Sequence, residues 1–265
     1  MKIVAIANQK GGVAKTTTAI NLAASLAEAG HRVLVIDMDP QGNASTGFGI
    51  GLDQRQLTVY DLLLGDVSAE AAVVETETER VWLIPATTEL SSSDVQLFNV
   101  NKRSFLLKDS LAATGLKAQR FDFVLIDCPP SLNLLTVNAL VAADSVLIPL
   151  QSEFFALEGL SQLMLTIREI RQTANPALRV EGILLTMHDQ RNNLAQQVES
   201  DARDTLGDLV YQTVIPRNVR LSEAPSYAMP AISYDSTSKG AMAYRAFAQE
   251  FLRNNNNLQK VEADG

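Results

Sequence analysis

Several residue types are scarce in this chain of 265 residues, and each scarcity excludes a class of protein. The single cysteine, Cys128, cannot form an intramolecular disulfide, and with only two histidines the chain has no cluster spaced to ligate zinc or an iron–sulfur centre. There is no run of eighteen or more apolar residues, and no cleavage site of small residues follows the short apolar start IVAIA. The sequence therefore predicts neither a disulfide-stabilised secreted protein nor a membrane-spanning or exported one.

Positive charge is also in short supply. The chain has 22 Lys and Arg against 30 Asp and Glu, a formal net charge of −8, which argues against strong nucleic-acid binding by the whole surface. The deficit is uneven, because residues 186–253 carry seven basic and eight acidic side chains, so a local basic patch is allowed there. With 46% hydrophobic and 20% charged residues, the composition is that of a soluble globular protein.

Short β-branched runs alternate with helical patterns, which is typical of βαβ units on a parallel sheet. Several of the runs are apolar throughout, so we expect a doubly wound, mainly parallel β-sheet with helices on both faces. Strands are expected at residues 2–8, 32–38, 81–86, 121–127, 145–150, 180–187 and 210–216. Helices are expected at residues 15–29, 104–114, 132–142, 157–172, 194–206 and 238–252.

The same pattern predicts one domain and a tail. We expect a single domain over residues 1–253 and a polar, flexible tail over residues 254–265. The segment 52–78 is the least regular, and we interpret it as an excursion at the sheet edge or over the site.

The stretch NQKGGVAKTT, residues 8–17, lies between the first expected strand and the first expected helix. A glycine-bearing turn at a helix N-terminus directs backbone N–H groups at an anion, and the helix dipole adds positive potential. In a phosphate-binding loop of this kind, Lys15 contacts the β- and γ-phosphates, Thr16 offers its hydroxyl to Mg²⁺, and Thr17 bonds the α-phosphate. The sequence therefore predicts a nucleotide site, although it does not match the usual pattern Gly-x4-Gly-Lys-Ser/Thr.

Carboxylates follow two further expected strands. Asp37 and Asp39 end the second strand, and Asp127 ends the fourth. Because the carboxyl ends of parallel strands border the ligand crevice, we expect these side chains near the loop. Asp127 is predicted to hold Mg²⁺ together with Thr16, directly or through water, and Asp39 to position the attacking water. A lone aspartate after a strand is usually a turn former, but the ordered set indicates a functional site.

The motifs KGGVAKTT, DMDPQGN, IDCPPSLNLLTVNAL, FFALEGL, LLTMHDQRNNL and VIPRNVRLSEAPS together resemble those of ParA/Soj chromosome-partitioning ATPases. This family belongs to the ParA/MinD group of P-loop NTPases, which has a deviant Walker A loop, and the resemblance covers residues 2–252. It implies a Mg²⁺-dependent ATPase, with ATP and Mg²⁺ as cofactors, that forms a homodimer on ATP and binds DNA without sequence preference. It also implies slow hydrolysis until a ParB-like centromere-binding partner stimulates it, and a cytoplasmic, nucleoid-associated location without membrane binding.

The resemblance also assigns residues to nucleotide chemistry. Lys10 corresponds to the extra lysine of the deviant loop, which in the family reaches the partner's phosphates across the dimer, and it joins Lys15 and Asp39 as the implied catalytic set. Adenine contacts in the family come from the loop after a late strand, which here is IPRNV. The implied ATP-binding residues are Lys10, Gly11, Gly12, Val13, Ala14, Lys15, Thr16, Thr17, Pro216 and Asn218.

DNA contacts are implied in the same way. The basic positions of the family fall on Arg191 and Arg220, with Arg217 and Lys239 as further members. Any one of these side chains alone is more often a solvated surface group. Non-specific binding needs only a few phosphate contacts, however, so a patch doubled by dimerisation is sufficient.

Other functions fit less well. A MinD-like membrane-cycling ATPase is the alternative, but it needs an amphipathic C-terminal helix that FLRNNNNLQKVEADG does not supply. A reductase of the nitrogenase-iron-protein type needs paired cysteines, and an ATP-dependent synthetase like dethiobiotin synthetase needs a substrate pocket that no motif indicates. Because the first strand begins at Lys2, we expect no preceding helix-turn-helix and no operator-specific DNA binding.

A few positions carry separate expectations. Ala14 departs even from the deviant loop, which has glycine there, and a positive φ at an alanine costs about 1 kcal/mol. We expect a negative φ and a harmless methyl group. Cys128 and Trp82 are expected in the core, and His31 and His188 at the surface or in loops.

Overall fold

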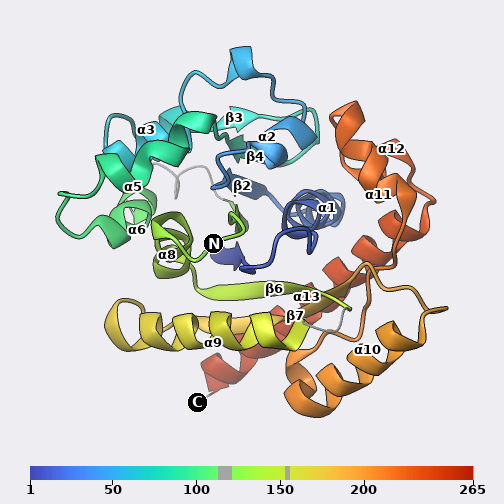
Figure 1. Ribbon diagram of the computed structural model, residues 1–265. Coiled ribbons are helices and arrows are strands. Elements are labelled where there is room, and N and C mark those ends of the chain that lie inside the picture. The colour runs from blue at the N-terminus through green and yellow to red at the C-terminus, as the bar shows by residue number, and fades with distance from the viewer. Residues whose placement is uncertain (113–120, 153–155, 265) are drawn as a thin grey trace.

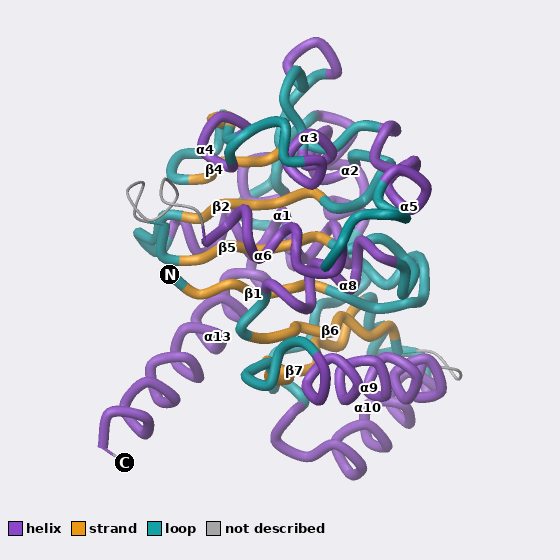
Figure 2. The backbone as a smooth tube through the Cα atoms, turned by 90° about the vertical axis from the view of Figure 1, so that its left-hand side faces the viewer, coloured by secondary structure: helices purple, strands orange, loops and turns teal. Residues whose placement is uncertain are grey.

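The computed structural model describes residues 1–112, 121–152 and 156–264, and within them one seven-stranded sheet forms the centre of the molecule. Its strand order is β3-β4-β2-β5-β1-β6-β7, and its pairs are parallel except for the antiparallel β3–β4 edge. Figure 2 shows the strands stacked from β4 to β7. The strands are β1 (Lys2–Ile6), β2 (Val33–Asp37), β3 (Val74–Glu75), β4 (Val81–Ile84), β5 (Phe123–Asp127), β6 (Ser145–Gln151) and β7 (Arg179–Thr186).

Helices cover both faces of this sheet (Figure 1), which confirms the doubly wound architecture. Alternate residues of each central strand point to opposite faces. Thus Val4 belongs to the core beneath α1 (Lys15–Glu28) and α13 (Lys239–Asp264), whereas Ala5 belongs to the core beneath α8 (Leu134–Ala142). The other α-helices in the described ranges are α2 (Asn43–Gly47), α3 (Val59–Leu64), α4 (Ala69–Ala72), α5 (Ser93–Gln96), α6 (Leu106–Ala112), α9 (Ala156–Thr173), α10 (Asn193–Leu206), α11 (Val219–Glu223) and α12 (Ala231–Tyr234).

Most predicted elements are present with shifted ends. The predicted helix 104–114 is a 3₁₀ turn followed by α6, and its last two residues lie outside the described part of the chain. The irregular segment 52–78 forms α3 and α4 and then enters β3, so its place at the sheet edge is confirmed. Cys128 is buried as expected, and Trp82 packs edge-on against Phe121 with their ring centroids 5.4 Å apart.

The predicted strand at residues 210–216 is wrong. Two isolated bridges take the place of a regular ladder: Val210 pairs with Ile183 in β7, and Pro216 pairs with His188 just beyond β7. The Gln212 and Thr213 amides instead donate to the two carboxylate oxygens of Glu250 in α13, at 2.7 and 2.9 Å. A side chain therefore satisfies the backbone donors that a regular ladder would use.

Helix α13 is longer than predicted, because it continues past Leu252 to Asp264. Asn255 is buried, and its amide nitrogen donates to Glu181 Oε1 at 2.8 Å and to the Phe251 carbonyl at 2.8 Å. Lys2 Nζ donates to Glu181 Oε2 at 2.6 Å and also to Asn255 Oδ1. The run of asparagines thus starts inside the packed domain, and Figure 2 shows α13 then reaching away from the sheet. The predicted flexibility of the last residues stays a prediction.

None of the helices in the described ranges combines the length and the apolar character needed to cross a bilayer.

Candidate nucleotide site

The turn after β1 forms a loop that runs directly into the N-terminus of α1 and is fixed from several sides. Asn8 Nδ2 donates to the Pro149 carbonyl in β6 at 2.8 Å, and Asn8 Oδ1 accepts from the Lys10 amide at 3.0 Å. Thr186, at the end of β7, donates its hydroxyl to the Val13 carbonyl at 3.1 Å. The loop is therefore held by β6, which pairs with β1, and by β7 beyond it, which gives its N–H groups a fixed direction.

Ala14 is the N-cap of α1 and has φ 67° and ψ 33°, in the left-handed region. The expectation of a negative φ is therefore wrong. The reason is local, because the chain must reverse from the loop into the helix, and the Ala14 carbonyl accepts the first helical hydrogen bond from the Thr18 amide at 2.9 Å. Alanine thus occupies a position that favours glycine.

Lys15 is buried at the first position of α1, with 7% of its surface exposed. Its Nζ donates to the Lys10 carbonyl at 3.0 Å. Burial lowers the pKa of Lys15, while the nearby Asp127, Cys128 and Asp39 act in the opposite direction. The ammonium group therefore lies between the loop and the strand-end carboxylates.

Asp37 and Asp127 are register partners at the ends of β2 and β5, and both are fully buried. Asp37 accepts hydrogen bonds from the Ser45 amide at 2.8 Å, the Ser45 hydroxyl at 2.7 Å and the Asp39 amide at 3.2 Å. Burial nevertheless raises the pKa of Asp37 to about 6, with a further contribution from Asp39. Three hydrogen bonds thus stabilise the ionised form of this carboxyl group, whereas its burial favours the neutral form.

Asp127 has no such partners. Both of its carboxylate oxygens are buried, and neither accepts a hydrogen bond of normal geometry from a described residue, although the Thr16 side chain lies close enough to lower the pKa of this carboxyl group. Burial, and then the charge of Asp37, raise the pKa of Asp127 well above its usual range, against the opposing influence of Thr16 and Lys15. A buried carboxylate without donors is costly unless a cation or a proton compensates it.

The chemistry of this group fits Mg²⁺. The ion takes oxygen ligands and is commonly held by one or two carboxylates, with the remaining positions filled by phosphate oxygens and water. Asp127 supplies a carboxylate and Thr16 a hydroxyl beside it. No group of three His, Cys, Asp or Glu within the described residues could hold a metal ion.

Asp39 lies just beyond the end of β2 and is 8% exposed. Its Oδ1 accepts from the Gln41 amide at 3.0 Å, so the turn that follows fixes its carboxylate. Its charge influences the pKa of both Lys15 and Asp127. The structure therefore brings the predicted loop and carboxylate residues together at the carboxyl ends of β1, β2 and β5.

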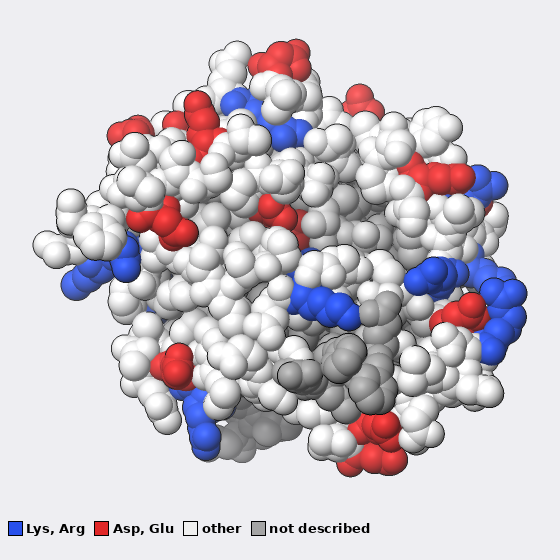
Figure 3. Space-filling view, viewed as in Figure 1, with Lys and Arg blue, Asp and Glu red and all other residues white. Residues whose placement is uncertain are grey.

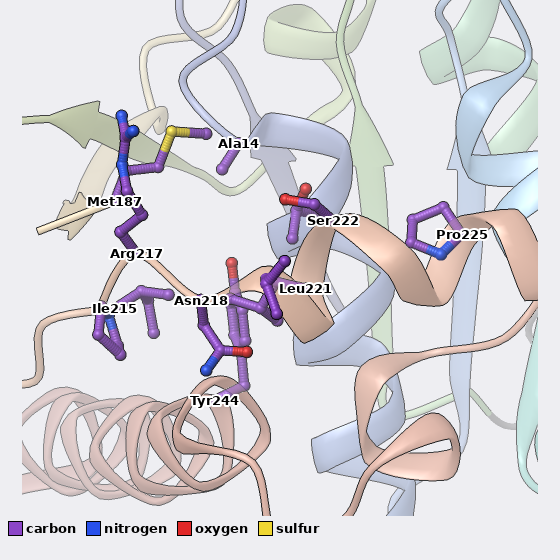
Figure 4. A pocket seen from close by; sticks show the side chains of 12 residues that line it. Ala14, Met187, Ile215, Arg217, Asn218, Leu221, Ser222, Pro225 and Tyr244 are labelled. Atoms are coloured by element: carbon purple, nitrogen blue, oxygen red, sulfur yellow. The ribbon is translucent and has the colours of Figure 1, made fainter.

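A pocket of about 620 Å³ opens beside the loop (Figure 4). Ala14 lies across it from Asn218 and Tyr244, and Pro216 and Thr17 also line it. The two predicted adenine contacts, Pro216 and Asn218, are thus next to the phosphate loop, although their role stays a prediction. Its other lining residues are Met187, Ile215, Arg217, Val219, Leu221, Ser222 and Pro225.

Tyr244 is a lining residue that the sequence did not reveal. It is fully buried in α13, and its hydroxyl lies 3.0 Å from Thr18 Oγ1 in α1. A tyrosine in a late amphipathic helix is usually an ordinary core residue. Only the packing of α13 on α1 brings it under the pocket.

The predicted DNA contacts do not form one continuous basic patch. Arg191, Arg217 and Lys239 line a second hollow of about 880 Å³, which Asp189 and Glu199 share. Figure 3 likewise shows basic side chains along the right-hand rim with acidic ones among them. Arg191 is paired with Asp189, with Nε and Oδ1 3.1 Å apart.

Arg220 is not a lining residue of that hollow. Its Nη1 lies 2.8 Å from Glu223 Oε2, and its Nε lies 3.3 Å from Asp235 Oδ2. Both arginines that the family resemblance places first are therefore ion-paired within the chain.

His188 lies in the loop between β7 and α10, as one of the two expected placements had it, but it is not a surface residue, because its side chain is only 6% exposed and its Nε2 lies 3.0 Å from Glu199 Oε2. Its amide donates to the Ile215 carbonyl at 3.1 Å, and its carbonyl accepts from the Arg217 amide at 3.0 Å. These two hydrogen bonds hold the segment 215–217, of which Pro216 and Arg217 line both the pocket and the second hollow. His31, in contrast, is partly exposed, as expected.

Comparison with known sequences gives long matches. A family model described as an AAA domain matches residues 1–180. The chain is 52% identical over 263 residues to chromosome partitioning protein ParA of Caulobacter vibrioides (strain NA1000 / CB15N), covering 99% of this chain and 98% of that protein. It is 50% identical over 253 residues to sporulation initiation inhibitor protein Soj of Bacillus subtilis (strain 168), covering 96% and 99%.

Solved structures agree with the fold. Cobyrinic acid a,c-diamide synthase from Mycobacterium smegmatis, solved with bound ADP and magnesium, has a TM-score of 0.83 at 40% identity and covers 97% of this chain and 96% of its own. The cell division ATPase MinD of Pyrococcus furiosus has a TM-score of 0.79 at 26% identity, covering 95% and 98%. On these matches and on the geometry of its phosphate loop, the chain belongs to the ParA/Soj family of P-loop partitioning ATPases.

Proposed function

We propose that this protein is a Mg²⁺-dependent ATPase that hydrolyses ATP to ADP and phosphate. The observation that carries the proposal is the buried carboxylate of Asp127, which lies close enough to Lys15 and Thr16 to be affected by both. The pocket beside the same loop, lined by Ala14 and Thr17, is large enough for a nucleoside. The cobyrinic acid a,c-diamide synthase, which is 40% identical, was solved with ADP and magnesium, and this supports a nucleotide and Mg²⁺ as ligands here. MinD, which is 26% identical, is named an ATPase, and this supports the same activity.

Each residue of the site has one role in nucleotide binding or hydrolysis. The loop amides and Lys15 bind the phosphates, and the base occupies the pocket beside Pro216 and Asn218. Thr16 and Asp127 would hold Mg²⁺, which neutralises charge on the phosphate oxygens when bound. Asp39 orients the attacking water from the end of β2.

We further propose that hydrolysis is coupled to DNA segregation. In this proposal ATP brings two copies together, and Lys10 of each copy reaches the phosphates of the other. A cation supplied only on dimerisation stabilises the charge that develops on the γ-phosphate, so an isolated chain hydrolyses ATP slowly. The names of relatives that match almost the whole chain at about 50% identity support partitioning as the process.

The dimer would bind bulk DNA, and a ParB-like partner would stimulate hydrolysis and release it. The local balance of charge near Arg191, Arg217, Arg220 and Lys239 supports weak, salt-sensitive affinity rather than tight binding. Doubling the basic groups by dimerisation makes that affinity dependent on ATP.

Co-sedimentation with random-sequence DNA under ATP, ADP and no nucleotide tests this proposal. We expect retention with ATP only, and we expect it to fall steeply as salt is raised. Arg217→Ala and Lys239→Ala should each reduce the slope of log affinity against log salt by about 0.9 per lost phosphate contact. Arg191→Ala and Arg220→Ala should weaken DNA binding less, because Asp189 and Glu223 already neutralise those two side chains.

Lipid vesicles form the other arm of the experiment. Binding to anionic vesicles under ATP, with none to DNA, would favour the MinD-like membrane-cycling alternative. DNA retention that does not depend on nucleotide would contradict the ATP-driven dimer. In every arm, an ATP-analogue titration verifies that the variants still bind nucleotide.

A further inference from the structure

Arg55 is a charged residue buried far from the phosphate loop in sequence, and no motif draws attention to it. It caps the 3₁₀ turn Leu52–Gln54 and is 8% exposed. Burial lowers the pKa of its guanidinium, and the charge of Asp37 opposes that change. A buried guanidinium is costly, so its retention needs a reason beyond filling space.

Its donors all point to one short segment and its neighbour. Arg55 Nε and Nη2 donate to the Ile50 carbonyl at 3.1 and 2.8 Å. Nη2 also donates to Thr46 Oγ1 at 2.8 Å, and Nη1 donates to the Ala86 carbonyl at 3.0 Å. The rigid fork of the guanidinium thus ties α2 and the chain after it to the segment that follows β4.

The same segment begins with the turn that carries Asp39. The Gly42 amide donates to the Asp39 carbonyl at 2.9 Å, and Gly42 has φ 62°. A Cβ at Gly42 would overlap Arg55 Nη1 and press on the Ala86 carbonyl, so the turn lies directly on the guanidinium. Thr46 Oγ1 donates in turn to the Gly42 carbonyl at 3.1 Å, which closes the connection between Arg55 and the turn.

A second buried chain of hydrogen bonds fixes the other side of this turn. Ser45 donates from its amide and hydroxyl to Asp37, and its hydroxyl oxygen accepts from the Ala86 amide at 3.1 Å. Asp37 in turn accepts from the Asp39 amide. Ala86 is therefore held by Ser45 through its amide and by Arg55 through its carbonyl.

We infer that Arg55 is a positioning residue for Asp39: it clamps the turn 39–50 so that the Asp39 carboxylate stays beside the phosphate loop. This inference rests on the proposed ATPase function and on Asp39 orienting the attacking water. Arg55 is connected to Asp39 through Thr46 and Gly42, so its effect on the reaction is indirect and passes through the turn.

The test uses the full chain and compares Arg55→Met with Arg55→Lys. We expect kcat for Arg55→Met to fall by about 10- to 100-fold, because small misplacements of a reacting group have effects of this size. Affinity for a non-hydrolysable ATP analogue should stay within about threefold, since the phosphate and base contacts are intact. Arg55→Lys keeps the charge but not the fork, so its kcat should remain low as well.

Hydrogen exchange supplies a readout that does not depend on turnover. Amides within residues 39–50 should exchange faster in both variants, while those of α1 keep their protection. Arg80→Met is the matched control, because Arg80 also donates to a backbone carbonyl, that of Gly30, but does so beside the start of β4. It should change neither kcat nor exchange in the turn.

Three results would overturn the inference: an unchanged kcat in Arg55→Met, an unchanged exchange rate in the turn, or a loss of kcat matched by an equal loss of analogue affinity. If Arg55→Met fails to fold, Thr46→Val replaces it, because that change removes one acceptor of the fork and keeps a β-branched shape. Asp39→Ala separates the two proposals: normal turnover in Asp39→Ala would refute the role of Asp39, whereas loss there with normal turnover in Arg55→Met refutes only the clamp.

Discussion

Replacing Ala14 by glycine should stabilise the protein, because this N-cap position has a left-handed backbone. The left-handed conformation costs an L-residue about 1–2 kcal/mol, and glycine removes that cost. Glycine's greater freedom in the unfolded chain offsets about 0.5–1 kcal/mol of the gain. The free energy of unfolding of Ala14→Gly should therefore rise by roughly 0.5–1 kcal/mol, which corresponds to about 1–3 °C in Tm for a chain of this size.

Affinity for ATP should change by less than about twofold, because a ligand responds only to strain that differs between the free and bound states. Thermal unfolding without nucleotide and an ATP-analogue titration measure the two quantities. Ala228→Gly is a parallel case, since Ala228 is exposed and has φ 56°. Ala71→Gly, at an exposed helical position in α4, should instead lose about 1 kcal/mol. A Tm for Ala14→Gly that falls like that of Ala71→Gly would refute the reasoning.

Two further predictions concern buried polar groups. Because the pKa of Asp127 is raised on folding, the stability linked to this group is fully present below its unfolded pKa of about 4 and is lost as pH rises through the folded pKa. Asp127→Asn should therefore raise Tm at pH 7.5 in EDTA without nucleotide, lose that gain towards pH 4, and abolish Mg²⁺-dependent hydrolysis; a gain independent of pH would contradict this account. Asn255→Ala should lower the free energy of unfolding in urea by about 1–3 kcal/mol, since it removes a partner from the buried Glu181 and Lys2. The exposed neighbour Asn256 provides the control, and an equal loss in Asn256→Ala would show that helix propensity is responsible instead.

The central strands and the phosphate loop could be predicted because their signals are local. An apolar run such as VLVID is buried on both sides wherever it lies in a parallel sheet, and a lysine after a glycine turn lies at a helix N-terminus. The segment 210–216 shows the limit of this reasoning. Its residues favour a strand, but Glu250, which belongs to the last helix, takes the hydrogen bonds of Gln212 and Thr213.

The site shows the same division. Lys15, Thr16, Asp39 and Asp127 could be predicted from motif order, and the structure brings them together. Arg55 could not, because it lies inside the irregular segment 52–78 and most of its acceptors are backbone carbonyls that carry no sequence signal. The sign of φ at Ala14 and the burial of His188 depend likewise on how distant segments meet.

The position of β1 in the sheet has a consequence for how the chain is made. Its two neighbours are β5 and β6, whose register begins at Lys2 with Phe123 and at Val4 with Ser145, and Lys2 is finally held by Asn255. A ribosome therefore releases the first strand long before any strand exists to receive it. The nascent chain carries an unpaired apolar strand until β5 and β6 have been made, so the nucleotide site cannot form before synthesis has passed Gln151, and the non-local pairing that it needs is of the kind that forms slowly.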